Sequence, residues 1–196
     1  MNTIQKNPHD LAALFHKYGS WTDKERVHCY GCLYERWLSR ISPLEHILEM
    51  GCNDFGGGSL LAFSERFPLA TIVGLDLTFS EIRDEIRERF NIHLFSGSAY
   101  QRETVERFRQ THPSSFDLVI DDCLHTADDQ YQAFLFWNEI LSPHGLYVIE
   151  DVHDLDGLSR RLANHTGTWD VMLGDARCEG TTCQSDSVLV GLQRHQ

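Results

Sequence analysis

A glycine-rich loop between two candidate buried strands constrains the fold of this 196-residue chain more than any other feature. One strand ends at Glu49, glycines follow at positions 51, 56, 57 and 58, and a second strand closes with Asp76. Glycine permits the positive φ angles of a tight turn and lets the backbone approach a ligand closely. A strand, a glycine loop and a helix in this order predict a βαβ unit that binds a ligand at the loop.

Strands and helices alternate along the rest of the chain. We expect strands at 47–50, 71–76, 92–95, 116–121 and 145–150, with helices at 59–67, 80–90, 102–110 and 127–141 between them. This alternation favours right-handed crossovers and a doubly wound, mostly parallel α/β sheet. Two more strands, 169–173 and 187–192, are separated only by a loop, which predicts an antiparallel hairpin at the edge of a seven-stranded sheet.

Two stretches with helical spacing, 8–18 and 30–41, precede the first strand. We therefore expect a single domain in which residues 1–43 form a helical cap or lid and residues 44–196 form a Rossmann-like core. Within the cap, Trp21, Tyr30 and Tyr34 are candidate stacking surfaces for a ligand. An aromatic core between the helices and the sheet is an equally good interpretation.

Charge and hydropathy limit the partners. The chain has 17 basic and 29 acidic residues, a net charge of −12, whereas nucleic-acid binders present a basic face to phosphates. No apolar run approaches the roughly 20 residues that cross a bilayer, and the N-terminus lacks the apolar stretch of a secretory signal. We expect a cytoplasmic protein that acts on a small molecule and neither on nucleic acid nor at a membrane.

Four of the six cysteines, Cys29, Cys32, Cys178 and Cys183, could in principle form a zinc site. The first two have CxxC spacing, but the second pair is loosely spaced. Unpaired small residues of the core are the better interpretation.

Glu49 precedes the first glycine and restricts the ligand. A dinucleotide loop reads GxGxxG and places a pyrophosphate at the helix N-terminus. A carboxylate at this point would repel the pyrophosphate, which disfavours a nicotinamide-dependent oxidoreductase. The acid suits an adenosine-containing cofactor with a positive amino group and no phosphate. Asp76 can accept hydrogen bonds from the ribose hydroxyls of such a cofactor. A turn without a ligand is less attractive, because consecutive glycines cost backbone entropy on folding.

These residues resemble class I S-adenosylmethionine-dependent methyltransferases. Four stretches are similar to a subgroup that includes macrolide sugar O-methyltransferases of the mycinamicin type and cephalosporin hydroxylase-like enzymes: YGSWTDKERVHCYGCLYERWL, GGGSLLAFSERFPLATIVGLDL, FDLVIDDCLH and LSPHGLYVIEDVH. The resemblance implies that S-adenosylmethionine binds at the loop and the neighbouring strand ends. The residues expected to hold it are Glu49, Gly51, Asn53, Gly57, Gly58, Ser59, Asp76, Leu77, Ser98 and Asp121.

Acidic pairs end two further strands, Asp121–Asp122 and Glu150–Asp151. Both ends lie at the carboxyl edge of a parallel sheet, and a divalent cation would relieve the repulsion between them. Oxygen ligands suit Mg²⁺ or Ca²⁺. Some of these acids could instead cap helices. The resemblance implies that Asp122, Glu150 and Asp151 hold Mg²⁺.

His125 follows the first acidic pair. Methyl transfer to oxygen requires removal of a hydroxyl proton, and the near-neutral pKa of histidine suits that task. The resemblance assigns the general base to His125, and we expect Asp122 to be catalytic as well. His28 and His153 are further candidates by position.

The expected activity is magnesium-dependent O-methylation of a sugar or another small hydroxylated metabolite. The chain carries Cys123 and Leu124 where the subgroup usually has glycine and serine. Another hypothesis is a cofactor-binding partner subunit without catalysis. A homodimer is also possible, and the sequence does not identify the acceptor.

Overall fold

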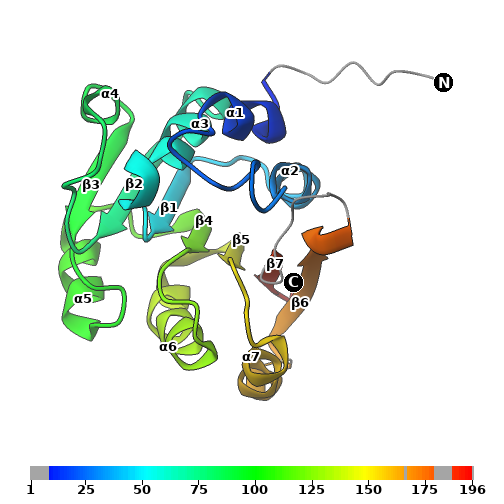
Figure 1. Ribbon diagram of the computed structural model, residues 1–196. Helices are drawn as coiled ribbons and strands as arrows, with labels where there is room; N and C mark the ends of the chain where they lie inside the picture. Colours follow the sequence, from blue (N-terminus) through cyan, green and yellow to red (C-terminus); the bar gives the residue numbers. More distant parts are fainter. Residues whose placement is uncertain (1–8, 166, 179–186, 196) are drawn as a thin grey trace.

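The computed structural model describes residues 9–165, 167–178 and 187–195, and its strands form one mixed sheet in the order β3-β2-β1-β4-β5-β7-β6 (Figure 1). The strands are β1 (His46–Met50), β2 (Thr71–Asp76), β3 (Ile92–Ser96), β4 (Phe116–Asp121), β5 (Leu141–Ile149), β6 (Trp169–Asp175) and β7 (Val188–Arg194). β1 to β5 are parallel, and β7 lies antiparallel between β5 and β6. The expected seven-stranded sheet with a C-terminal antiparallel hairpin is confirmed.

Helices cover both faces of this sheet (Figure 1). The helical segments are α1 (Leu11–Lys17), α2 (Gly31–Leu38), η1 (Asp54–Gly56), α3 (Gly58–Arg66), α4 (Asp84–Arg87), α5 (Arg102–Thr111), α6 (Ala127–Trp137), η2 (Asn138–Ile140), α7 (Leu155–Leu162), η3 (Ala163–His165) and η4 (Ala176–Cys178). The buried side chains of α1 to α4 belong to one apolar cluster and those of α5 to α7 to the other. The sheet therefore lies between two helical layers.

The N-terminal helices pack on the sheet through aromatic side chains. Phe15 of α1 meets Phe63 of α3 with ring centroids 5.5 Å apart and meets Tyr34 of α2 at 6.0 Å. All three rings are fully buried. Burying large aromatic surfaces supplies much of the free energy of packing. The cap is thus continuous with the core of the domain.

The strand register brings the carboxyl ends of the three central strands level with one another. Met50 of β1 lies opposite Asp121 of β4, and Asp121 lies opposite Ile149 of β5. The Asp122 amide donates to the Met50 carbonyl at 3.0 Å, and the Glu150 amide donates to the Asp121 carbonyl at 3.0 Å. The order of the strands reverses between β1 and β4, where open α/β sheets bind ligands.

Two helices differ from expectation. A helix over 80–90 was expected, but only Asp84–Arg87 is helical, because Arg83 has an extended backbone and its amide donates to the Gly56 carbonyl at 3.3 Å. Helix α7 was not expected. Its sequence signals were Asp154, whose side chain accepts from the Gly157 amide at 2.8 Å, and buried Leu158 and Leu162 at helical spacing.

The two cysteines of the N-terminal cap differ in burial. Cys32 is exposed and Cys29 is half-buried, so the interpretation of Cys32 as a core residue is wrong. Cys183 lies outside the described residues.

Among the helices that the structure describes, none has the length and apolar character needed to cross a bilayer.

Candidate active site

Two adjoining cavities lie at the carboxyl ends of β1, β2 and β4. The larger, about 340 Å³, is bordered by Asp76, Leu77 and Ser98, and the smaller, about 120 Å³, by Glu49, Ser59 and His125. Four residues line both cavities: Gly51, Asp54, Asp122 and Cys123. A ligand that extends from one cavity into the other therefore passes beside Asp122.

Gly51 makes the junction between the cavities possible. Its φ is +85°, and a Cβ at this position would lie 2.0 Å from the carbonyl oxygen of Asp122. A side chain would therefore force the ends of β1 and β4 apart, in addition to straining the backbone. The glycine requirement inferred from sequence has this steric cause.

The larger cavity has the features of a nucleoside site. Asp76 ends β2, and its carboxylate is fixed by the amides of Asn53 (2.9 Å) and Leu77 (2.7 Å). Leu77 and Leu124 flank the opening with 67% and 56% of their surfaces exposed, and so leave apolar area for a flat ring. The Tyr100 hydroxyl accepts from the Leu124 amide at 2.7 Å and so holds that side of the opening.

Glu49 supplies negative charge to the smaller cavity. The side chain is 1% exposed, and neither of its carboxylate oxygens has a hydrogen-bond partner among the described residues. Burial raises the pKa of Glu49, although the Lys24 ammonium 3.2 Å from Oε1 opposes this. A buried carboxylate without hydrogen bonds costs free energy unless a donor joins it. These orphaned oxygens fit the amino group of S-adenosylmethionine.

Lys24 enters the acidic edge of the sheet from the N-terminal cap. Its side chain is 2% exposed, and its ammonium contacts Glu49, Asp122 (2.8 Å) and Glu150. Although burial disfavours the charged amine, these carboxylates outweigh it and the pKa of Lys24 lies well above its usual value. The ammonium is therefore a fixed positive charge within the acidic edge.

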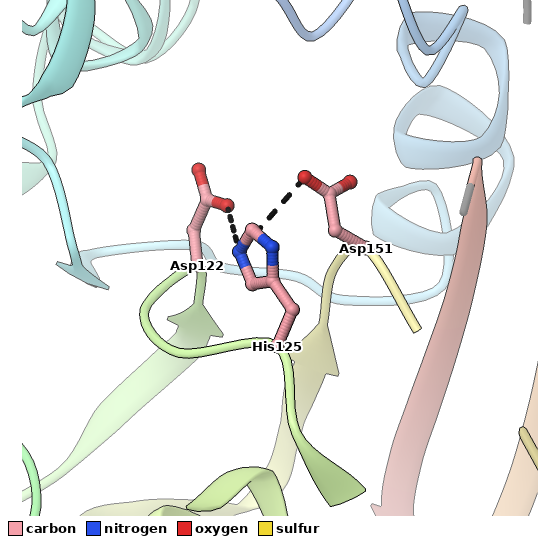
Figure 2. Close-up of side chains that lie close together, drawn as sticks. All are labelled: Asp122, His125 and Asp151. Atoms are coloured by element: carbon pink, nitrogen blue, oxygen red, sulfur yellow. Dashed lines mark ion pairs between the residues drawn. The ribbon is translucent and has the colours of Figure 1, made fainter. Parts of the chain in front are cut away.

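Asp122, His125 and Asp151 converge on one point (Figure 2). Nε2 of His125 lies 3.6 Å from Oδ1 of Asp122 and 3.9 Å from Oδ2 of Asp151. One potential ligand atom from each residue lies within 4.8 Å of the others. The two carboxylates are suitable oxygen ligands for a divalent cation, and the imidazole lies beside them.

The charges around His125 set its protonation. The Asp122 carboxylate is the main cause that raises the pKa of His125 above 6.5, and partial burial opposes it. Burial disfavours the Asp122 carboxylate, but Lys24 and His125 outweigh burial and hold its pKa below the usual range. Asp122 is therefore an anion in contact with two basic groups.

The second acidic pair is held by tyrosines of the cap. The Tyr30 hydroxyl donates to Oδ1 of Asp151 at 2.5 Å, and the Tyr34 hydroxyl donates to Oε1 of Glu150. Both rings are fully buried, so they do not offer the stacking surface that one of our interpretations suggested. Asp151 has a φ of +51°, a strained conformation that the contact with Tyr30 helps to maintain.

The expected site residues fall into two groups. Those that line one or both cavities are Glu49, Gly51, Ser59, Asp76, Leu77, Ser98, Asp122, His125 and Asp151. Those that support the walls from behind are Asn53, Gly57, Gly58, Asp121 and Glu150. Burial raises the pKa of Asp121 to about 8, and its oxygens have no hydrogen-bond partner among the residues described.

The other histidines differ in their surroundings. His28 is buried, stacks on Tyr30 with centroids 5.1 Å apart, and has Nδ1 3.0 Å from the Ser187 hydroxyl. His153 is exposed, with its ring centroid 5.7 Å from that of His125. His153 therefore lies at the rim of the site and His28 behind it.

Sequence reasoning missed Lys24, Phe55 and Tyr100 as residues of the site. Lys24 lies in a run of charged residues, Asp23 to Arg26, which is typical of a solvated turn. Only the strand ends that face it in the folded protein explain its burial. The one sequence signal at this residue was its place in the stretch YGSWTDKERVHCYGCLYERWL, which resembles the subgroup.

Comparisons with known proteins identify the family of this chain. The family model described as a methyltransferase domain matches residues 48–149, more than half of the chain. The 8-demethyl-8-(2-methoxy-alpha-L-rhamnosyl)-tetracenomycin-C 3'-O-methyltransferase of Streptomyces olivaceus is 34% identical over 69% of this chain and 34% of its own length. The mycinamicin VI 2''-O-methyltransferase of Micromonospora griseorubida is 30% identical over 76% of this chain and 35% of its length. The chain thus spans about a third of these curated relatives.

Solved structures share the fold. The MycE methyltransferase from the mycinamycin biosynthetic pathway, in complex with Mg, SAH and mycinamycin VI, superposes with a TM-score of 0.72 at 22% identity, covering 95% of this chain and 55% of that one. An O-methyltransferase from Bacillus cereus in complex with SAH gives a TM-score of 0.63 at 12% identity, covering 97% and 93%. The likeness shows that the seven-stranded sheet and its helical layers are a known arrangement.

Proposed function

The chain belongs to the methyltransferase domain family, and from that premise we propose that it transfers a methyl group from S-adenosylmethionine to a hydroxyl of a sugar-bearing small molecule. One observation carries the proposal. The cavity bordered by Asp76 joins the cavity bordered by Glu49 beside Asp122, and His125 borders the second cavity with Nε2 3.6 Å from Asp122. The two relatives described above methylate sugar oxygens by name, which supports the choice of acceptor.

Each end of the methyl donor has a suitable partner. Glu49 would bind the amino group, because its buried oxygens lack hydrogen bonds and a charge-assisted bond would satisfy them. Asp76 would bind the ribose hydroxyls, and Leu77 and Leu124 would cover the adenine ring. When bound, S-adenosylmethionine supplies an activated methyl group, and the protein contributes orientation.

His125 would accept the proton of the acceptor hydroxyl. Its Nε2 faces Asp122 and Asp151, whose charges stabilise the imidazolium after transfer. A divalent cation, when bound, would lower the pKa of the hydroxyl. Asp122 and Asp151 have oxygens positioned to hold it. The resemblance adds Glu150 to the ligands, but this carboxylate is bonded to Lys24 and Tyr34.

The acceptor would reach the junction past Phe55. A further cavity of about 400 Å³ lies beside the smaller one and shares Thr22, Asp23 and Phe55 with it. Phe55 is 63% exposed in a left-handed conformation with φ of +57°. Sugars pack on aromatic faces through their apolar sides and donate hydroxyls to acids, so Phe55 and Asp23 suit a sugar.

Calorimetric titration tests this function. S-adenosylmethionine, S-adenosylhomocysteine and NADH are each titrated with and without Mg²⁺. We expect S-adenosylhomocysteine to bind and NADH not to bind. Tight NADH binding without S-adenosylhomocysteine binding would show that the chain is an oxidoreductase instead. Transfer of a labelled methyl group to rhamnosylated acceptors then tests the sugar specifically.

A further inference from the structure

Lys24 and Glu150 form a buried ion pair that the proposed reaction leaves unexplained. The Lys24 side chain is 2% exposed and that of Glu150 is 1% exposed. The segment before α2 holds the lysine in place, because the Tyr30 amide donates to the Lys24 carbonyl at 2.7 Å. Buried ions persist only when a partner and hydrogen bonds compensate for lost hydration.

Both oxygens of Glu150 are already bonded. Oε2 accepts from the Lys24 ammonium and Oε1 accepts from the Tyr34 hydroxyl. The backbone is also fixed, since the Glu150 carbonyl accepts from the Gln130 side chain at 2.9 Å. A metal ion could recruit Glu150 only by displacing the buried ammonium of Lys24 or the hydroxyl of Tyr34.

The two carboxylate oxygens of Asp122 face different partners. Its Oδ2 accepts from Lys24 at 2.8 Å, whereas its Oδ1 faces His125 at 3.6 Å. Asp151 lies on the same side as Oδ1, with its Oδ2 3.9 Å from His125. The acidic edge is therefore divided into a side neutralised by Lys24 and a side that remains anionic.

The balance of charge shows that Lys24 does not make a metal unnecessary. Glu49, Asp122, Glu150 and Asp151 carry four negative charges when ionised, and Lys24 supplies one positive charge. With His28 and His125 neutral, each 3.6 Å from one of these carboxylates, three negative charges remain, which a divalent cation and the amino group of the methyl donor would neutralise. A second cation is thus expected on the side that Lys24 leaves free.

We propose that Lys24 is the permanent counter-ion of Glu150 and thereby restricts a divalent cation to the side formed by Asp122, His125 and Asp151. Lys24 is in this respect a positioning residue, since it acts by withdrawing one carboxylate from the metal. The restriction of the divalent cation rests on the metal site of the proposed function. It differs from the ligand set that the resemblance implies, which includes Glu150.

Mn²⁺ binding, followed by the loss of the electron paramagnetic resonance signal of the free ion, tests the restriction. Glu150→Gln should bind Mn²⁺ within about threefold of the unchanged protein, whereas Asp151→Asn should bind it about tenfold more weakly or worse. Lys24→Met should bind it more tightly because Glu150 becomes available, and adding Glu150→Gln to Lys24→Met should remove that gain. Lys17→Met, at an exposed lysine paired with Glu65, is the matched control.

Thermal unfolding in chelator tests the counter-ion without any metal or methyl donor. Lys24→Met should lower Tm by several degrees, about 5 °C or more, because buried carboxylates lose their partner. Adding Glu150→Gln should recover part of that loss, since a neutral amide needs no counter-ion. A cooperative melting transition of Lys24→Met shows that the single variant folds.

Several results would overturn the inference. If Glu150→Gln weakens Mn²⁺ binding as much as Asp151→Asn does, Glu150 is a metal ligand. No Mn²⁺ binding by the unchanged protein would refute the restriction together with the metal of the proposed function, while the S-adenosylhomocysteine titration judges the methyl donor separately. No recovery of Tm in the double variant would refute the counter-ion role.

Discussion

Replacing Glu49 with glutamine should separate cofactor binding from folding. The change keeps the shape of the side chain and removes its charge. In the folded protein the carboxylate is 1% exposed, lacks hydrogen bonds among the described residues, and contacts one cation, Lys24, at 3.2 Å. Its proposed role is to meet the amino group of the methyl donor, so the charge matters most when that ligand is bound.

The expected loss of affinity follows from the hydrogen bond that Glu49 would no longer make to the amino group. A hydrogen bond to a charged group contributes about 1.5–3 kcal/mol, so S-adenosylhomocysteine should bind about 10- to 100-fold more weakly to Glu49→Gln. The stability without ligand should change little. Lys24 keeps Asp122 and Glu150 as partners, and the removal of a buried charge offsets the loss of one ion pair. We expect Tm to stay within about 3 °C.

Isothermal calorimetry and thermal unfolding on the same preparations measure both effects. Glu103→Gln, at an exposed position on α5, is the matched control and should change neither value. An S-adenosylhomocysteine affinity within about threefold of the unchanged protein would refute the role of Glu49. A fall in Tm well beyond about 3 °C would show that Glu49 is needed for folding instead.

Other contacts lead to four further predictions. Gly51→Ala should abolish S-adenosylhomocysteine binding in calorimetry and lower the free energy of unfolding by about 1–3 kcal/mol, since its Cβ would meet the Asp122 carbonyl at 2.0 Å. His125→Ala should reduce turnover about 100-fold or more with unchanged cofactor affinity. In the unchanged protein the rate should rise with pH through a pKa above 6.5, because the neutral imidazole is the base. Burial disfavours the Glu35 carboxylate, but Arg66 and the Leu11 amide outweigh burial and lower the pKa of Glu35 below 4.5. Their stabilisation is present above pH 4.5 and is lost as pH falls through the folded pKa. Glu35→Gln should therefore cost about 1 kcal/mol in urea unfolding at pH 7 and almost nothing in strong acid, whereas an equal cost at both pH values would contradict the ion pair.

Local sequence patterns were sufficient for most of the sheet. β1, β2 and β4 begin and end within a residue of expectation, because fully buried parallel strands are short apolar runs bounded by polar residues. The segment over 80–90 was harder, since the Glu81 amide donates to the Asn53 side chain and Arg83 to the Gly56 carbonyl. Contacts with a distant loop thus overrode a helical pattern.

The candidate site shows the same division. Glu49, Gly51 and Asp76 could be inferred because each stands at a fixed distance from a strand end. Lys24 could not, because its position depends on three acids that are 25 to 126 residues away in the chain. Charge repulsion among the acids indicated that some cation was needed. The sequence did not reveal that one of the cations is a side chain.

The ammonium of Lys24 couples two parts of the chain that would otherwise be separable. It is carried by the segment between α1 and α2, yet its partners lie at the ends of β1, β4 and β5. If the N-terminal helices detached, several buried carboxylates would be left without their counter-ion at the centre of the sheet. The helices and the acidic strand ends must therefore assemble and come apart together, as one cooperative unit. An exchange of the N-terminal segment between related enzymes would succeed only if the incoming segment brings a lysine to the same point.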